Sequence, residues 1–372
     1  MRITFVIPCV GVFGGIRVVA THAHCLKNLG HDVLVVALKQ PQPTLRERVR
    51  ALLREGKILR RQPEEQDNYF QTGGVPLKIV DHPKPIVDDD VPNADIVVAT
   101  WWETAEWVAQ LSPAKGEKFY FIQHHEVFDV FHADRVRATY RTSLHKITIS
   151  QWLVDTLSQT YGAKQIALVP NSVDTTLFQA PPRQKNKVLT VGFLYFDTLW
   201  KGCDIILRAL DIVAQRRPEL RIVSFGTCQP LPELPLPTDA HYSCQPPQHT
   251  IKDIYASCDV WLFSSRSEGF GLPILEAMAC RTPVIGTPAG AAPGLLGGGG
   301  GLLVPPESPE DIAQAIEQVA QMSDLEWQAM SNQAYATATQ YSWDDAAILL
   351  EKTLSSQVKT SMTMTTKPIL RQ

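Results

Sequence analysis

The sequence lacks the features that mark several common classes of protein. It has no Cys-x-x-Cys pair, and its cysteines are odd in number and scattered, at Cys9, Cys25, Cys203, Cys228, Cys244, Cys258 and Cys280. This pattern argues against a disulfide framework and against a structural zinc site. No uninterrupted apolar stretch reaches the roughly 18 to 20 residues that are needed to cross a bilayer. We therefore expect no metal and no membrane-spanning helix.

The chain also has little net charge. Its 35 Lys and Arg residues face 38 Asp and Glu residues, which leaves a formal charge of -3. A chain with this balance has no overall attraction to nucleic acid or to a membrane, so no nucleic-acid partner is predicted. Residues 1–15 resemble the apolar part of a signal peptide, but they lack a cleavage site and a glycine loop interrupts them, which favours a buried first strand. The expected location is cytoplasmic, with docking at the inner face of a membrane left open.

What the sequence does contain is a regular alternation of short apolar runs and helical patterns, which is typical of parallel βαβ units. Its 372 residues suit two domains. The strands expected in the first half are residues 3–8, 32–38, 77–80, 95–100, 118–123 and 146–150, and those in the second half are residues 188–191, 221–225, 241–244, 260–263, 283–286 and 301–304. Most runs lack alternation, so helices should cover both sheet faces. The predicted fold is α/β, with two doubly wound Rossmann-like domains facing a central cleft.

The domain boundary is predicted near Pro170, where proline, asparagine and basic residues separate two such sets of runs. We expect domains at residues 1–170 and 171–354, with the last helix able to return to the first domain, and a disordered tail at residues 355–372. Residues 45–61 carry seven basic and two acidic side chains. They fit either a solvated helix in a long connection or a basic amphipathic helix that rests on anionic lipid or holds an anionic acceptor.

The strongest chemical signal is the segment of residues 265–279, Ser-Arg-Ser-Glu-Gly-Phe-Gly-Leu-Pro-Ile-Leu-Glu-Ala-Met-Ala. Its glycines allow close approach of the backbone to a ligand, and Pro273 suits the first turn of a helix. The amides of Phe270, Gly271 and Leu272 are then free to hold an anion such as phosphate. Glu276, about one turn inside the helix, has two oxygens for a vicinal diol such as a ribose, whereas Glu268 could accept from a sugar hydroxyl.

Glu268 and Glu276, on either side of Gly-Phe-Gly-Leu-Pro-Ile-Leu, resemble the paired-glutamate motif of retaining GT-B glycosyltransferases of the family 4 type, or glycosyl transferases group 1. Further segments resemble that family in the same order along the chain. They are Gly14-Gly15-Ile-Arg-Val-Val, Leu-Gly-His-Asp-Val at residues 29–33, Pro-Asn-Ser-Val-Asp at residues 170–174, Lys201-Gly202, and the segments 283–286 and 301–305. The resemblance spans roughly residues 1 to 350 with long gaps, and its weight comes from the order and spacing of these motifs.

The resemblance implies a hexosyltransferase-type enzyme that moves a sugar from a nucleotide-diphosphate donor to a saccharide or lipid-linked acceptor with retention of anomeric configuration. It implies an acceptor-side first domain, a donor-binding second domain, and no cofactor or metal, because a helix start and basic side chains neutralise the diphosphate. The site residues that it implies are His124, His125 and Glu268 for catalysis, with His124 ranked first, and Gly14, Gly15, Lys201, Phe270, Gly271, Leu272 and Glu276 for the donor.

The sequence departs from the family pattern at two places. The family usually has an arginine after the glycine of the strand that precedes the lysine, but Phe193 follows Gly192 here, and Gly-Ala-Ala-Pro-Gly at residues 290–294 replaces Gly-Gly-x-Pro-Glu. One cation for the diphosphate is missing, unless another basic residue substitutes for it. Two alternatives therefore stay open: a non-catalytic GT-B-like protein that binds nucleotide sugar, and a nucleotide-sugar epimerase or phosphorylase.

Overall fold

The computed structural model describes residues 1–11, 14–39, 46, 69–128 and 131–365. The chain divides into two compact units, each built around one sheet. The N-terminal unit consists of residues 1–148, 157–167 and 347–372, and the C-terminal unit consists of residues 149–156 and 168–346. Each unit thus combines segments that are far apart in the sequence and that are held together by packing.

The N-terminal unit contains a seven-stranded sheet in the order β3-β2-β1-β4-β5-β6-β7. Neighbouring strands from β3 to β6 are parallel. On one face of the sheet, Val6, Val97 and Tyr120 pack against helices α4 (Trp102–Gln110) and α5 (Ala133–Thr139). On the other face, Phe121 contacts His22 of helix α1 (Gly14–Asn28). Both faces are therefore covered. The strands are β1 (Arg2–Ile7), β2 (Asp32–Leu38), β3 (Leu77–Val80), β4 (Ile96–Ala99), β5 (Glu117–Ile122), β6 (His145–Thr148) and β7 (Ala167–Leu168).

The helices of this part of the chain fill the connections between those strands. The order of strands reverses between β1 and β4, so their carboxyl ends form a switch point, where doubly wound folds place ligands. The helices are α1 (Gly14–Asn28), α3 (Tyr69–Thr72), η1 (Asp88–Asp90), α4 (Trp102–Gln110), η2 (Pro113–Lys115), α5 (Ala133–Thr139) and α6 (Gln151–Tyr161), and helix α13 (Trp343–Thr365) joins this unit from Ala347 on.

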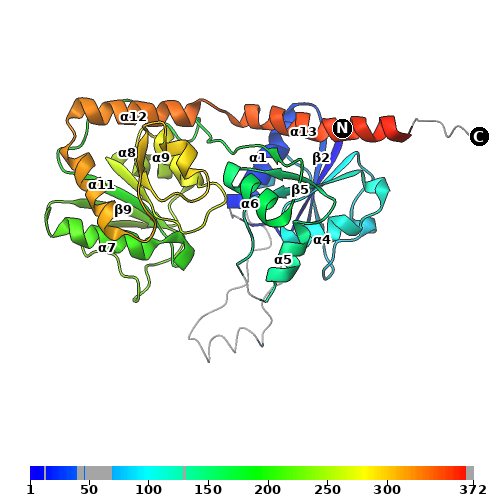
Figure 1. Ribbon diagram of the computed structural model, residues 1–372, viewed down its shortest axis with the longest axis horizontal. Helices are drawn as coiled ribbons and strands as arrows, with labels where there is room; N and C mark the ends of the chain where they lie inside the picture. The colour runs from blue at the N-terminus through cyan, green and yellow to red at the C-terminus, as the bar shows by residue number, and fades with distance from the viewer. Residues whose placement is uncertain (12–13, 40–45, 47–68, 129–130, 366–372) are drawn as a thin grey trace, which may run out of the picture. The chain divides into compact units, whose positions relative to one another are not determined.

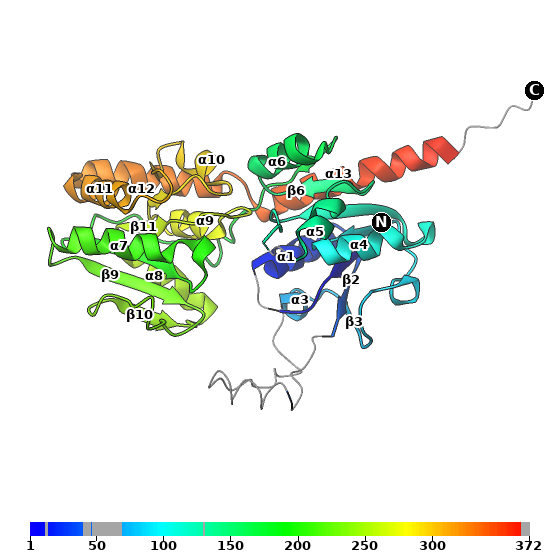
Figure 2. The same ribbon diagram turned by 60° about the horizontal axis from the view of Figure 1, so that its bottom comes forward.

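The C-terminal unit contains a six-stranded parallel sheet in the order β10-β9-β8-β11-β12-β13, drawn in green to orange in Figures 1 and 2. The strands are β8 (Thr190–Tyr195), β9 (Arg221–Gly226), β10 (His241–Cys244), β11 (Val260–Phe263), β12 (Val284–Gly286) and β13 (Gly301–Leu303). The order reverses between β8 and β11, which places the switch point at the carboxyl ends of these two strands.

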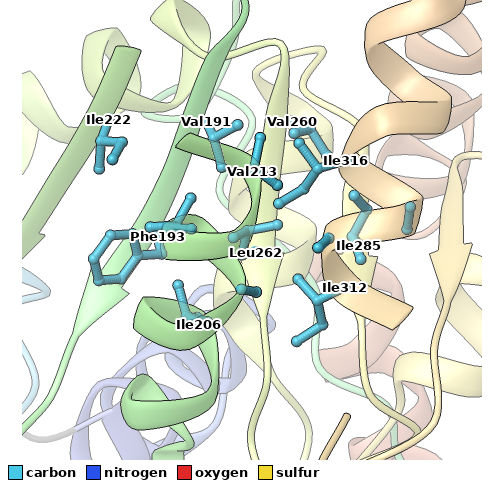
Figure 3. Close-up of a cluster of buried hydrophobic side chains, with 14 of the residues drawn as sticks. Val191, Phe193, Ile206, Val213, Ile222, Val260, Leu262, Ile285, Ile312 and Ile316 are labelled. Carbon is cyan, nitrogen blue, oxygen red and sulfur yellow. The ribbon is translucent and has the colours of Figure 1, made fainter. Parts of the chain in front are cut away.

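Helices cover both faces of the second sheet. On one face Val191, Phe193 and Leu262 pack against Ile206 of α7 and Ile316 of α11 (Figure 3). On the other face, Tyr255 of α8 contacts Trp261 of β11, with ring centroids 4.4 Å apart. The helices are η3 (Leu199–Lys201), α7 (Cys203–Ala214), η4 (Gln248–Thr250), α8 (Ile251–Ser257), α9 (Leu272–Ala279), α10 (Ala292–Leu296), α11 (Pro309–Gln321) and α12 (Asp324–Thr339).

The structure confirms the α/β class, the two Rossmann-like sheets and all twelve predicted strands, and it adds β7. The prediction of a disordered tail from residue 355 is wrong for residues 355–365, which continue helix α13. This part of the chain has neither glycine nor proline, so nothing stops the helix that Leu350 and Leu354 anchor with buried side chains. Of the basic segment 45–61, all but Arg46 lies outside the described residues. Within the described residues no helix is long and apolar enough to span a membrane.

Candidate functional site

The switch point of the C-terminal unit brings together two loops that are distant in sequence. Strands β8 and β11 are neighbours, and the chain leaves them through residues 196–202 and 264–271. Gly202 has φ 67°, and a Cβ atom there would lie 2.1 Å from the Ser264 carbonyl oxygen, so only glycine permits this approach. The Ser264 hydroxyl donates to the Gly202 carbonyl at 2.7 Å. The two loops are therefore locked side by side.

A charged pair lies at this junction. The Lys201 ammonium is 2.5 Å from the Glu268 carboxylate, whose same oxygen accepts a hydrogen bond from the Ser265 hydroxyl at 3.1 Å. The two charged side chains are 25% and 11% exposed, so most of the pair is shielded from water. In such a pair each charge depends on the other, because removal of one partner leaves the remaining charge poorly solvated. The predicted donor lysine and catalytic glutamate are thus in direct contact.

The start of helix α9 presents an anion site next to this pair. Gly271 is the residue before the helix and has φ 97°, and Pro273 lies in the first turn. Within the described part of the chain, the amides of Phe270, Gly271 and Leu272 donate to no other protein group. Unpaired amides at a helix start, together with the helix dipole, attract phosphate or carboxylate groups. The three predicted amides are therefore available for a ligand.

The Glu268–Gly271 loop is held from behind by contacts that the sequence did not reveal. The Ser150 hydroxyl and the Trp152 indole nitrogen both donate to the Gly269 carbonyl, at 2.7 Å and 2.9 Å. The Ala291 amide donates to the Phe270 carbonyl at 2.8 Å. No local pattern could have predicted the first two bonds, because the donors precede Gly269 by more than a hundred residues.

Glu276 lies one turn inside α9 and is buried, with 7% of its surface exposed. One of its carboxylate oxygens accepts a hydrogen bond of 2.9 Å from the Tyr255 hydroxyl of α8. Tyr255 itself is fully buried, so this bond fixes the direction of the carboxylate. Glu276 is therefore a preorganised acceptor near the helix start, as its predicted role on a diol requires.

The remaining cation of the two loops, Arg266, is engaged elsewhere. Its guanidinium binds Asp204 at 2.8 Å and Glu307 at 2.5 Å. These two carboxylates raise the pKa of Arg266 further above its usual range. Phe193, which replaces the family's arginine, is fully buried in the core (Figure 3). Residues 196–202 and 264–271 thus offer Lys201 as the cation for an anionic ligand.

The predicted residues of the N-terminal unit gather at the carboxyl ends of β1 and β5. Gly14 and Gly15 begin helix α1, and the side-chain amide of Gln123 donates a hydrogen bond to the Gly15 carbonyl at 3.1 Å. A Cβ atom added at Gly14 would meet no atom within 4 Å, which leaves open space at this helix start. His124 follows Gln123, and its ring lies 4.8 Å from that of Phe128. The sheet thus brings the glycines and the histidine segment to one edge.

The two histidines differ in their surroundings. The His125 ring is 2.6 Å from the Tyr161 hydroxyl and stacks on Tyr140, and burial lowers its pKa below the usual value. The His124 Nδ1 atom donates to the backbone carbonyl of His125 at 3.1 Å. His125 is thus part of a tyrosine cluster, which favours His124 as the residue for contact with a ligand.

Glu126, the next residue, was not among the predicted site residues. It is 3% exposed and accepts hydrogen bonds from the Trp102 amide at 2.9 Å and the Tyr120 hydroxyl at 3.1 Å. Burial raises its pKa to about 8. The side chain therefore anchors the start of helix α4. This long-range contact could not be predicted from the local sequence, in which a glutamate simply follows two histidines.

Within the described residues no group of three or more His, Cys, Asp or Glu side chains is placed to hold a metal ion.

Comparison with known proteins assigns both halves of the chain to described domain families. Residues 13–177 match the family model of "Glycosyltransferase Family 4", and residues 185–322 match that of "Glycosyl transferases group 1". The chain therefore contains a domain of each family, in this order. The first match includes strands β2 to β7 of the N-terminal sheet, and the second includes all six strands of the C-terminal sheet.

Among solved structures, the chain is similar to Anabaena HepE in complex with UDP and glucose, with a TM-score of 0.73 and 19% identity over 96% of this chain and all of that one. The chain is also similar to sucrose-phosphate synthase from Thermosynechococcus elongatus, with a TM-score of 0.70 and 15% identity over 97% of this chain and all of that one. These likenesses establish the GT-B fold.

Curated relatives match over shorter stretches. A D-inositol 3-phosphate glycosyltransferase from Corynebacterium jeikeium is 30% identical over 44% of this chain and 42% of its own length. An MMP alpha-(1->4)-mannosyltransferase from Mycolicibacterium hassiacum is 29% identical over 50% of this chain and 46% of its own length. The chain thus spans about half the length of these curated relatives.

Proposed function

We propose that the protein is a retaining glycosyltransferase that moves a sugar from a nucleotide-diphosphate donor to a saccharide or lipid-linked acceptor. The observation that carries the proposal is the Lys201–Glu268 pair beside the free amides of Phe270, Gly271 and Leu272. The two glycosyltransferase domain matches support it. UDP in the HepE structure makes a uridine nucleotide the first donor to test.

In this proposal the donor diphosphate lies on the amides at the start of α9, and the Lys201 ammonium stabilises the charge that grows on it as the glycosidic bond breaks. Glu268 accepts from a sugar hydroxyl and stabilises the positive character of the anomeric carbon. The acceptor hydroxyl attacks from the face that the diphosphate leaves and passes its proton to a departing phosphate oxygen. The role expected for His124, to orient the sugar through a hydroxyl, stays a prediction.

The first test is donor hydrolysis, measured as release of nucleoside diphosphate from UDP-, GDP- and dTDP-sugars. We expect slow hydrolysis of one donor class, and we expect it to survive EDTA, because Lys201 and the α9 amides supply the charge balance that Mg²⁺ provides elsewhere. Loss of activity in EDTA with recovery in Mg²⁺ or Mn²⁺ would contradict the metal-free mechanism. Binding of a donor without any turnover, even with acceptors, would favour the non-catalytic alternative.

Glu276 is proposed to bind the ribose, which does not change during transfer. The Glu276→Ala variant should bind free nucleoside diphosphate more weakly by about 1 to 3 kcal/mol, the usual loss for hydrogen bonds to a charged group. Calorimetry with nucleotide alone measures this loss. The Tyr255→Phe variant keeps the carboxylate but removes the bond that directs it, so a smaller loss is expected. Wild-type affinity in Glu276→Ala would remove this residue from the donor site.

Binding of an anionic membrane through residues 45–61 and location at the inner face of a membrane stay predictions. The segment lies, apart from Arg46, outside the described residues. Its seven basic side chains are the feature on which these predictions rest.

A further inference from the structure

Arg266 connects the two loops of the switch point, although the proposed mechanism gives it no role. It lies in the same loop as Glu268, and its backbone amide donates to the Trp200 carbonyl at 2.8 Å. Its guanidinium donates through Nη1 to the Leu199 carbonyl. Both carbonyls belong to η3, whose last residue is Lys201. Arg266 therefore holds the backbone that carries the proposed diphosphate cation.

Burial of apolar side chains contributes little to the conformation of η3. The Leu199 and Trp200 side chains are 76% and 44% exposed. A single turn of helix is not stable without contacts from the rest of the protein. The contacts that η3 makes with the neighbouring loop include the two bonds from Arg266 and the lock between Gly202 and Ser264. We therefore expect the position of η3 to depend on polar contacts, with Arg266 foremost.

Two carboxylates fix the direction of the Arg266 guanidinium. Asp204 of α7 accepts from Nη1 at 2.8 Å and from Nη2 at 2.9 Å, and Glu307 accepts from Nε at 2.5 Å and from Nη2 at 2.9 Å. These paired bonds match the planar fork of a guanidinium, which a lysine ammonium cannot reproduce. Glu307 has φ 59°, a left-handed conformation that residues other than glycine rarely adopt. The chain thus places a strained residue where the second carboxylate meets Arg266.

We propose that Arg266 is a positioning residue, which fixes the backbone of η3 and thereby places the Lys201 ammonium for the donor diphosphate. It does not contact the donor itself, because the five N–H donors of its guanidinium are matched by five bonds to protein oxygens. The proposal rests on the proposed function only where it assigns Lys201 to the diphosphate. The hold on η3 does not depend on that assignment.

The exposure of this cluster separates positioning from general stabilisation. The side chains of Arg266, Asp204 and Glu307 are 28%, 31% and 54% exposed. Ion pairs with this much access to water contribute little to the stability of a fold. Loss of Arg266 should therefore change the geometry of the loop and leave the C-terminal unit folded.

The first measurement is the rate at which a pulse of acetic anhydride modifies each lysine of the full chain without nucleotide, read by peptide mass spectrometry. The ion pair with Glu268 keeps Lys201 protonated and slow to react, so its release in Arg266→Met and Arg266→Lys should speed acetylation about threefold or more. Lys185, whose ammonium donates to backbone carbonyls of the same unit, should keep its wild-type rate and report that the unit is folded. The exposed Arg216→Met variant is the matched control and should leave the rate of Lys201 unchanged.

The Glu307→Gly variant provides a second test without any change at Arg266. It removes one carboxylate from the guanidinium but also relieves the left-handed backbone, so its melting temperature should stay close to that of the wild type. Positioning predicts that Lys201 nevertheless reacts about twofold faster or more, because Arg266 has lost one of the two groups that direct it. A contact that served only stability would leave the reactivity of Lys201 at the wild-type rate.

Calorimetry with UDP completes the test, and Arg266→Lys should bind it about 3- to 10-fold more weakly although the positive charge is kept. Wild-type acetylation of Lys201 in Arg266→Lys and Glu307→Gly would overturn the proposal. Loss of UDP affinity in Arg266→Lys with wild-type acetylation would also overturn it, because Arg266 would then contact the nucleotide directly. Faster acetylation with unchanged UDP affinity would confirm the hold on η3 and would instead remove Lys201 from the proposed diphosphate site.

Discussion

Replacement of Glu268 by glutamine is expected to lower kcat by about 100- to 1,000-fold, the range seen when one group that stabilises transition-state charge is removed. The affinity for free nucleoside diphosphate should change far less, because Glu268 is proposed to act on the sugar and not on the nucleotide. The glutamine keeps the shape of the side chain and its contact with the Ser265 hydroxyl. The measurement is steady-state turnover together with calorimetry without sugar.

The exposed Glu310→Gln variant in the same unit is a suitable control and should keep wild-type turnover. The comparison with Glu276→Ala gives the decisive contrast, because that variant should lose affinity for free nucleotide. Equal losses of nucleotide affinity in the Glu268 and Glu276 variants would show that the roles of the two glutamates are wrongly assigned.

The second large effect is expected at Lys201. The Lys201→Met variant should bind nucleoside diphosphate about 10- to 100-fold more weakly, because it loses a charged hydrogen bond to the ligand. It also leaves the mostly buried Glu268 carboxylate unopposed beside an incoming anion. No other cation of the two switch-point loops can replace it, since Arg266 is held by Asp204 and Glu307. The exposed Lys187→Met variant is the charge-matched control.

A double-mutant cycle tests whether the ion pair governs this effect. If Glu268 repels the diphosphate once Lys201 is gone, the Lys201→Met/Glu268→Gln variant should bind nucleotide more tightly than Lys201→Met alone. Strict additivity of the two changes would show that the carboxylate does not contribute to the loss. Wild-type affinity of Lys201→Met would exclude the lysine from the diphosphate site.

The strands and the glycine loop could be predicted from the sequence because their signals are local. Apolar runs indicate β8 and β11, and the close spacing of Gly271 and Pro273 indicates the start of a helix. The Lys201–Glu268 contact could not be predicted in this way, because it depends on β8 and β11 being neighbours in the sheet, and hydrophobic periodicity does not specify the order of strands. The family resemblance suggested a role for each of the two residues, and only the fold shows that their side chains are in contact.

What the sequence could not predict depends on contacts between distant segments. The bonds from Ser150 and Trp152 to Gly269, and the bond from the Trp102 amide to the buried Glu126 carboxylate, arise only when the chain has folded. Strand β7 has two residues, too few for a periodic pattern. The length of α13 was missed because serine and threonine suggested a tail, whereas Leu354 anchors that part of the helix in the protein.

Helix α13 also has a consequence for exchanging domains between related proteins. From Ala347 on it belongs to the N-terminal unit, and the carboxylate of its Glu351 lies 2.9 Å from the ring of His31, the residue before β2. A chimaera cut once near Pro170 would pair the N-terminal sheet with the last helix of the other protein and would leave the cavities for Leu350 and Leu354 badly filled. A graft of the C-terminal unit, which contains the proposed donor site, must therefore carry residues 149–156 and 168–346 together and leave the chain's last helix with its first strands.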